Sequence, residues 1–263
     1  MRWSWTDLGI LIGPRILAAC VPIDYSRIAA DYDAIRADEV ADREFWLPAL
    51  RAVGRLEAGE RILDVGAGTG RYARLLAEFT RVVAFDLSPD MLAQARGKGA
   101  FGIVRGDAHR LPFREAAFDA AVLVMVLHQL ADYRLVLREI ARVAARAAIA
   151  TTDMGHRDLG ILGEAFPRWV EIDRARFPAT DAIVESLARS GFSEVRVQRR
   201  VLQKSVPTAV QLERIRRRYI STLELIPREE FERGLAFLEA ELPRRCGDTY
   251  ESSAEFTFLG ASR

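Results

Sequence analysis

Residues 62–70 read Ile62-Leu63-Asp64-Val65-Gly66-Ala67-Gly68-Thr69-Gly70, and this stretch decides the fold class. A short apolar run enters three alternating glycines, and a helical pattern over residues 71–79 follows. Glycine suits such a turn because it adopts backbone angles that a Cβ disfavours and lets a ligand approach the main chain. The free N–H groups at the start of the next helix can bind a carboxylate or a phosphate. The stretch therefore predicts a strand–turn–helix unit that binds a ligand.

The glycine spacing argues against a nicotinamide dinucleotide. A dinucleotide site has the spacing G-x-G-x-x-G, which requires glycine at position 71, where this chain has Arg71. The spacing here is G-x-G-x-G, and Asp64 lies two residues before the first glycine. A close-set turn of this kind leaves little room for a pyrophosphate. It fits a ligand with an amino-acid tail, and Asp64 would help to hold the ammonium group of that tail.

Two further acids stand at the ends of the next expected strands. Asp86 ends the strand over residues 81–86, where a doubly wound fold places a carboxylate that accepts hydrogen bonds from both ribose hydroxyls. Asp107 ends the third strand, where it can accept from an adenine amino group while the N–H of Ala108 contacts a ring nitrogen. One such acid alone would be an ordinary cap or turn residue. Three acids at the ends of successive strands, together with the glycine loop, favour a nucleoside-binding site.

Strands and helices alternate along the rest of the chain. Strands are expected at 102–105, 118–124, 146–152, 194–204 and 255–261, and helices at 71–79, from Ser88-Pro89, at 135–145 and over most of 157–190. This order predicts right-handed βαβ units and a parallel sheet. Residues 24–54 also have helical spacing, and residues 208–242 are expected to form a helical pair split near Pro227. We expect an N-terminal extension over 1–23, then a single domain over 24–263 with lid segments 24–54 and 208–242.

Composition limits the classes of partner. The chain has 263 residues, 38 Lys and Arg against 37 Asp and Glu, and a net charge of +1. No field of one sign exists to attract nucleic acid or an anionic membrane, so neither is expected as a partner. Cys20 and Cys246 lie in no zinc or disulfide pattern, which favours a cytoplasmic protein without a metal. A monomer or a homodimer is expected.

The N-terminal segment allows more than one interpretation. Residues 8–21 are largely apolar, and the residues up to Cys20 look like a lipoprotein cleavage site. Pro14 and Arg15 interrupt the apolar run and leave it too short to span a bilayer. A packed extension, or a start site assigned too far upstream, explains the segment better.

Four segments carry a resemblance to a known family: residues 62–70, 83–92, 106–113 and 118–128. Together they resemble the class I S-adenosylmethionine-dependent methyltransferases, and most of all the type 11 group that includes the ubiquinone and menaquinone C-methyltransferases. The resemblance implies a transferase with an α/β, doubly wound, Rossmann-like sheet of seven strands in the order 3-2-1-4-5-7-6, the last strand antiparallel. It also implies S-adenosyl-L-methionine as cofactor, S-adenosyl-L-homocysteine as product, and a binding site over the C-terminal ends of strands one to four.

The resemblance gives candidate residues for each role. The candidate cofactor-binding residues are Asp64, Gly66, Ala67, Gly68, Gly70, Asp86, Leu87, Asp107, Ala108 and Val124. Val124 and Met125 stand where the family often has small polar residues, which suggests a small, partly apolar methyl acceptor. His128 is the candidate base, because it follows the fourth strand and has a suitable ordinary pKa, although it could equally pack or cap the next helix. Tyr25 and Tyr32 are candidates for substrate contact, or core residues.

Other methyl-transfer chemistries fit less well. The chain has no Asn/Asp-Pro-Pro turn after the fourth strand for nucleobase amino groups, no cysteine there for cytosine C5, and no acid cluster there for a catalytic metal. Four arginines between Arg214 and Arg218 could form an RNA-facing patch, but on a helix they would spread around a solvated face. An RNA or protein methyltransferase remains an alternative, as does a noncatalytic protein that binds S-adenosylmethionine.

Overall fold

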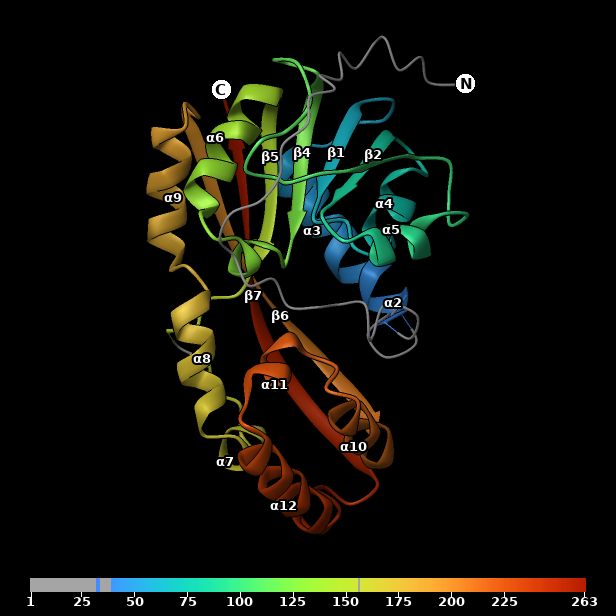
Figure 1. Ribbon diagram of the computed structural model, residues 1–263, viewed down its shortest axis with the longest axis vertical. Coiled ribbons are helices and arrows are strands. Elements are labelled where there is room, and N and C mark those ends of the chain that lie inside the picture. Colours follow the sequence, from blue (N-terminus) through green and yellow to red (C-terminus); the bar gives the residue numbers. More distant parts are fainter. Residues whose placement is uncertain (1–31, 34–38, 156) are drawn as a thin grey trace.

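The computed structural model describes residues 32–33, 39–155 and 157–263, and Figure 1 shows its sheet with helices on both sides. The strands are β1 (Arg61–Val65), β2 (Arg81–Asp86), β3 (Gly102–Arg105), β4 (Phe118–Val124), β5 (Ala144–Thr151), β6 (Glu194–Pro207) and β7 (Thr249–Ser262). Their order in the sheet is β3-β2-β1-β4-β5-β7-β6. The first five strands are parallel, and β7 is antiparallel to both β5 and β6. The predicted fold class, strand order and reversed last strand are confirmed.

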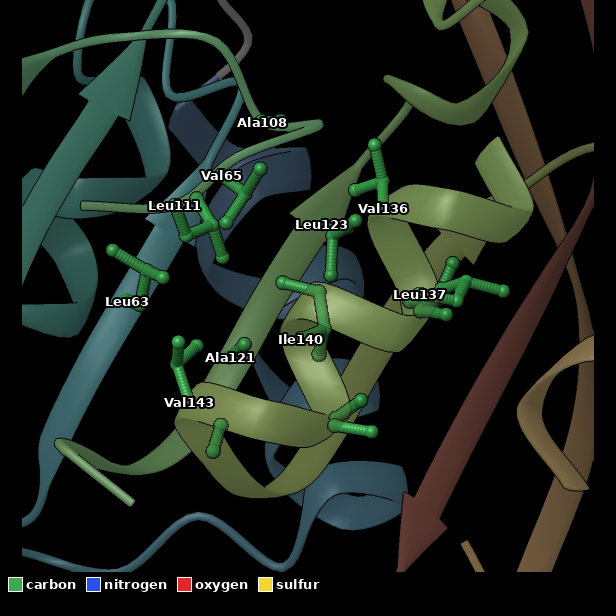
Figure 2. Close-up of a cluster of buried hydrophobic side chains, with 14 of the residues drawn as sticks. Leu63, Val65, Ala108, Leu111, Ala121, Leu123, Val136, Leu137, Ile140 and Val143 are labelled. Carbon is green, nitrogen blue, oxygen red and sulfur yellow. The ribbon is translucent and has the colours of Figure 1, made fainter. Parts of the chain in front are cut away.

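Alternating side chains of each central strand build two separate cores. In β1, Ile62 faces one side of the sheet and Leu63 the other, because successive strand residues point to opposite faces. The Ile62 side is covered by α3 (Leu47–Gly54) and α4 (Arg71–Leu76), with Trp46 from the π-helical turn η2 (Asp42–Trp46) that follows α2 (Glu39–Ala41). The Leu63 side is covered by α6 (Tyr133–Val143) and α9 (Thr180–Arg189). Figure 2 shows α6 lying over β4 on that side, with Leu63 and Val65 of β1 beside it.

Helix starts near the C-terminal edge of the sheet follow local side-chain chemistry. Ser88 caps α5 (Pro89–Ala95), as its Oγ accepts from the N–H of Met91 at 3.3 Å. Asp132 caps α6 by accepting from the N–H groups of Arg134 and Leu135, so the helix begins two residues before the predicted position 135. These caps fix the loops that surround the site described below.

β6 and β7 continue beyond the sheet and carry a third group of helices. β5 ends its pairing with β7 at Thr151 and Thr257, so residues 200–207 and 249–256 pair only with each other. Around this ribbon pack α7 (Ile161–Ala165), α8 (Arg168–Arg176), α10 (Thr208–Arg216), α11 (Ser221–Leu225) and α12 (Arg228–Cys246). They share a core that includes Trp169, Ile215 and Leu238. We call the ribbon and these five helices the helical arm; Figure 1 shows it facing the end of the sheet where β4 finishes.

The arm differs from the sequence expectation in two ways. Residues 208–242 were predicted as a pair of helices, but they lie in α10, α11 and α12. Both late strands are longer than predicted, since β6 reaches Pro207 and β7 begins at Thr249. The added residues are mostly polar or exposed because they form a two-stranded ribbon. Only the part of β7 in the sheet has the apolar density that marks a strand.

The predicted domain boundaries and lid segments stay predictions. Residues 1–31 and 34–38 lie outside the described part of the chain, so the 1–23 extension and much of the 24–54 segment do too. Within 39–54, α3 packs on the sheet against β5 and β7, whereas Trp46 reaches the site described below. None of the helices in the described ranges has the length and apolarity to cross a bilayer.

The contact between α3 and β7 leaves no space for a side chain at Gly260. A Cβ on Gly260 would lie 1.8 Å from the carbonyl oxygen of Val53, which is backbone and cannot rotate away. We expect Gly260→Ala to lower the free energy of unfolding by about 1–3 kcal/mol, since overpacking of a close contact costs this much. Gly102→Ala is the control, because a Cβ there makes only ordinary contact with Val83. Urea unfolding that gives equal stabilities for the two variants would contradict this packing.

Candidate functional site

A cavity of about 1630 Å³ lies between the C-terminal edge of the sheet and the helical arm. Its sheet side is lined by the glycine loop, the ends of β2 and β4, and the loop after β3. Its arm side is lined by residues of α8, α10, α11 and the β6–β7 ribbon. The volume exceeds the roughly 300–1,000 Å³ of a typical single-ligand pocket. The cavity therefore has space for two ligands side by side.

The glycine loop has the backbone geometry that the sequence predicts. Gly66, Gly68 and Gly70 all have positive φ, at 72°, 54° and 76°. A Cβ on Gly66 would lie 2.4 Å from Val126 Cγ2, whereas a Cβ on Gly68 would meet no described heavy atom within 4 Å. Gly66 is thus required by the fold on two grounds. Gly68 instead turns an open main-chain surface toward the cavity.

Asp86 joins the glycine loop to the end of β2. Its Oδ2 accepts from the N–H of Gly68 and its Oδ1 from the N–H of Ser88, both at 2.8 Å. Burial raises the pKa of the Asp86 carboxyl, and the N–H groups of Ser88, Gly68 and Leu87 oppose that rise. The carboxylate lines the cavity and holds the loop in shape at the same time.

Asp64 is a buried carboxyl group behind the loop. Its side chain belongs to a residue that is only 2% exposed, and its Oδ2 has no hydrogen-bond partner among the described residues. Burial and the nearby Asp86 charge raise the pKa of Asp64 to about 7, although the N–H of Ala73 acts to lower it. Such a group gains from a cation placed beside it, because a buried charge without a partner is costly.

Asp107 is oriented by a histidine that the sequence analysis did not connect with it. The Oδ1 of Asp107 accepts from the N–H of His109 at 2.9 Å and lies 2.6 Å from its Nδ1. The His109 Nε2 accepts from the N–H of Asp132 at 3.1 Å, so the ring proton is on Nδ1 and is donated to Asp107. The spacing of two residues between Asp107 and His109 was the only sequence signal. His109 acts here as a positioning residue for the acid.

Hydrogen bonds and ion pairs hold two residues that precede β1 against the glycine loop and the start of α4. Thr69 donates from Oγ1 to Asp33 at 2.6 Å, and Lys98 pairs with Asp33 while donating to the carbonyl of Thr69 at 2.8 Å. Arg71 stands where a dinucleotide site has glycine. It forms a bidentate ion pair with the buried Asp42. Asp33 and Asp42 are therefore held against the glycine loop and the start of α4.

The end of β4 presents an apolar surface and a stacked histidine. Val124 and Met125 both line the cavity, and Met125 has a φ of 51°, which is uncommon for a residue with a side chain. Its N–H donates to the carbonyl of Ala150 at 2.8 Å, which holds this conformation. His128, in the 3₁₀ turn η3 (Leu127–Gln129), stacks on Phe177 with ring centroids 4.0 Å apart. His128 therefore packs against an aromatic ring and faces the cavity as well.

Polar side chains of the arm also reach the cavity, and sequence reasoning missed them. Asp173 on α8 is 3% exposed and accepts from Trp169 Nε1 at 2.9 Å and from Thr222 Oγ1 at 2.6 Å. Arg176 and Arg157 line the cavity beside it. No local motif marks these residues. Their proximity depends on how the arm packs, which the sequence pattern did not predict.

The predicted site residues meet in the cavity with few exceptions. The candidates that line it are Gly66, Ala67, Gly68, Tyr32, Asp86, Leu87, Asp107, Ala108, Val124 and His128. Asp64 and Gly70 do not line it: Asp64 is buried, and a Cβ on Gly70 would point at Ala95 and Phe101. Tyr25 lies outside the described residues. The roles of these residues remain proposals.

Two other expectations can be compared with the structure. Between Arg214 and Arg218, Arg216 pairs with Glu239 and Glu213, and Arg218 stacks on Phe231, so these arginines do not form one continuous basic face. In the described ranges, no group of three or more His, Cys, Asp and Glu side chains is arranged to hold a metal ion.

Comparison with known proteins agrees with this geometry. Residues 63–150 match the family model of a methyltransferase domain. Demethylmenaquinone methyltransferase of Geobacillus kaustophilus is 27% identical over 207 residues, covering 66% of this chain and 88% of that protein. Malonyl-[acyl-carrier protein] O-methyltransferase of Herminiimonas arsenicoxydans is 33% identical over 189 residues, covering 67% of each chain.

Solved structures show the same fold at lower identity. A protein of Anabaena variabilis, assigned to methyltransferases of an antibiotic biosynthesis pathway, has a TM-score of 0.65 at 22% identity, covering 80% of this chain and 94% of that one. Phosphoethanolamine N-methyltransferase 2 of Haemonchus contortus, in complex with S-adenosyl-L-methionine, has a TM-score of 0.59 at 20% identity, covering 90% and 57%. With the sheet order and the glycine loop, these matches show that the chain belongs to the class I S-adenosylmethionine-dependent methyltransferases of the type 11 group.

Proposed function

We propose that this methyltransferase acts on a small, partly apolar acceptor enclosed between the sheet edge and the helical arm. The observation that carries the proposal is the continuity of the cavity, which runs from the glycine loop to α8, α10 and α11. Apolar side chains such as Met125, Phe177 and Leu225 line it together with a few polar groups, as in other small-molecule sites. A polymer substrate would need an open and usually basic track, and Arg216, which pairs with Glu213 and Glu239, gives no support for one.

The cofactor half of the cavity fits S-adenosylmethionine residue by residue. The open main chain at Gly68 suits the amino-acid tail, and the unsatisfied Oδ2 of Asp64 suits its ammonium group, directly or through water. Asp86 would accept from the ribose hydroxyls, and Asp107, held by His109, from the adenine amino group. Leu87, Ala108 and Val124 would contact the nucleoside and the sulfur region. Gly70 would contribute by allowing the backbone turn of the glycine loop, where its φ is positive.

The chain's own residues would supply alignment and a dry surface. S-adenosylmethionine provides an already activated methyl group, so no elaborate catalytic group is needed. Met125 and Phe177 exclude water from the acceptor, which keeps it aligned for in-line attack. His128 faces the same space and would remove a proton from the acceptor. Tyr32 and the segments 24–54 and 208–242 would cover the cavity, with Tyr25 near the acceptor.

The names of the relatives support methyl transfer to a small acceptor group. Their names refer to a demethylated menaquinone and to a malonyl group on a carrier protein. The balanced charge and the cysteine usage fit a cytoplasmic enzyme, acting as a monomer or a homodimer.

Removal of the Asp86 carboxylate should weaken cofactor binding. Hydrogen bonds to a charged group contribute about 1.5–3 kcal/mol each, so Asp86→Ala should raise the Kd for S-adenosylhomocysteine at least about tenfold. Asp181→Ala, at an exposed acid in the first turn of α9, is the control and should not change that Kd. Calorimetric titration measures both. Asp86 also accepts from the N–H of Gly68, so an unfolding curve must show that each variant is folded, and Asp86→Asn is measured as a second, smaller change. An unchanged Kd in a folded variant would refute the ribose assignment.

The raised pKa of Asp64 predicts a pH-dependent stability of the ligand-free protein. The folded-state pKa of about 7 lies above the unfolded value of about 3.9, so the folded state binds the extra proton between these values. The contribution of Asp64 to stability therefore falls as pH rises through this range, by about 4 kcal/mol at most. The Asn side chain does not titrate, so Asp64→Asn does not lose this contribution. The free energy of unfolding of the variant, relative to wild type, should therefore rise between about pH 5 and about pH 8. Urea unfolding at both pH values tests this, and parallel profiles would contradict the raised pKa.

Transfer of the labelled methyl group tests the activity and the role of His128. Incubation with methyl-labelled S-adenosylmethionine and a metabolite collection should label a small acceptor, and no labelled RNA should form. His128→Phe keeps an aromatic ring against Phe177 but removes the base, so kcat should fall by about a hundredfold with the Kd for S-adenosylhomocysteine unchanged. Full activity of this variant would reduce His128 to a packing role. Labelling of RNA alone would overturn the small-acceptor proposal.

A further inference from the structure

Arg157 is a cation directed into the arm side of the cavity with little to neutralise it. It lines the cavity, and within the described ranges its Nη1 donates a hydrogen bond to Thr152 Oγ1 at 3.3 Å. Arg157 is half-buried and is one of the residues that line the cavity. A guanidinium has five N–H donors, so most of its donor capacity is available to a ligand.

The neighbouring residues leave a positive excess at this place. Asp173 is the acid whose charge acts on Arg157, but Asp173 also accepts from Trp169 and Thr222 and lies 3.7 Å from Arg176. Arg176 donates to Thr222 Oγ1 at 3.4 Å and to Ser221 Oγ at 3.3 Å, which fixes its guanidinium at the cavity wall. Two guanidinium groups therefore share one carboxylate.

Glu251 of the ribbon also lines the cavity, and three other acids on this side have partners of their own among the described residues. Asp153 accepts from Gly155 and Thr180, and Asp158 accepts from Gly160. Glu255 lies 3.8 Å from Arg199 on the ribbon. Burial lowers the pKa of the Arg157 guanidinium, while Asp173 and Tyr219 raise it, which agrees with a cation that has lost water and gained only part of a counter-charge.

The surroundings match a recognition site better than a structural ion pair. Asp173, Gln211, Ser221 and Thr222 are buried polar residues of the arm, and all four line the cavity. They lie among apolar residues such as Trp169 and Ile220, which also line it. A few convergent polar groups in an apolar wall are the usual arrangement of a pocket that orients one end of a ligand.

We propose that Arg157 and Arg176 bind an anionic group of the methyl acceptor, a carboxylate or a phosphate. The inference rests on the proposed small-molecule function and names the substrate class for it. Arg157 would face the anion with its free donors, and Arg176, Ser221 and Thr222 would complete the site. The apolar wall of Val201, Ile220 and Leu225 lies along the same cavity, so the acceptor joins an anionic end in the arm to an apolar body.

Binding of three probes with one chain length tests the anion site. Octanoate, octyl phosphate and octanamide are titrated by calorimetry into the protein loaded with S-adenosylhomocysteine. At least one anion should bind about tenfold or more tightly than the amide, because charge-assisted hydrogen bonds are about twice as strong as neutral ones. The anion that binds more tightly identifies the source as a carboxylate or a phosphate. No preference for either anion over the amide would overturn the proposal.

Two variants and a control separate the site from general charge. Arg157→Gln should remove most of the preference for the anion, and Arg157→Lys should keep a part of it. Arg228→Gln, at an arginine of the arm that is exposed and does not line the cavity, should keep all of it. An Arg157→Gln variant that still prefers the anion would contradict the assignment. If S-adenosylhomocysteine does not bind the wild type, the proposed function fails; if it binds without anion preference, only this inference fails.

Discussion

The two hydrogen bonds of Asp86 join the glycine loop to the end of β2 and the start of α5. Because β1 and β2 are parallel neighbours, their C-terminal ends meet at one edge, and the Asp86 carboxylate can reach both Gly68 and Ser88. One group thereby fixes the loop after β1 and the start of α5. Burial raises the pKa of Asp64 behind the loop, and the charge of Asp86 raises it further, so this carboxyl group gains from a cation placed beside it. Shape and charge of the cofactor half both depend on this one residue.

A second constraint comes from the reversed strand β7. Its antiparallel pairing with β5 and β6 lets both late strands run past the sheet and support helices that face the site. The sheet edge thus supplies the cofactor half, and the arm supplies the other half of the cavity.

The sequence predicted the sheet half far better than the arm. β2, β3 and β4 have the predicted bounds, because buried parallel strands are short apolar runs, and the glycine loop follows from the backbone angles it needs. Arg157 and Arg176 lie far in sequence from the loop and in no motif, so only packing brings them to the cavity. On the ribbon, residues 205–207 and 249–254 were not predicted as strand, because they are mostly polar or exposed.

A crystal structure with S-adenosylhomocysteine tests the account most directly. The amino-acid tail should lie against Gly68, the ribose at Asp86 and the adenine at Asp107, with the sulfur turned toward the arm side of the cavity. The position of the sulfur is decisive, because the transferred methyl group is bonded to it and the acceptor attacks the methyl carbon from the side opposite the breaking C–S bond. A sulfur that points away from His128 and the arm, or a cofactor bound elsewhere, would contradict the assignment of the two halves.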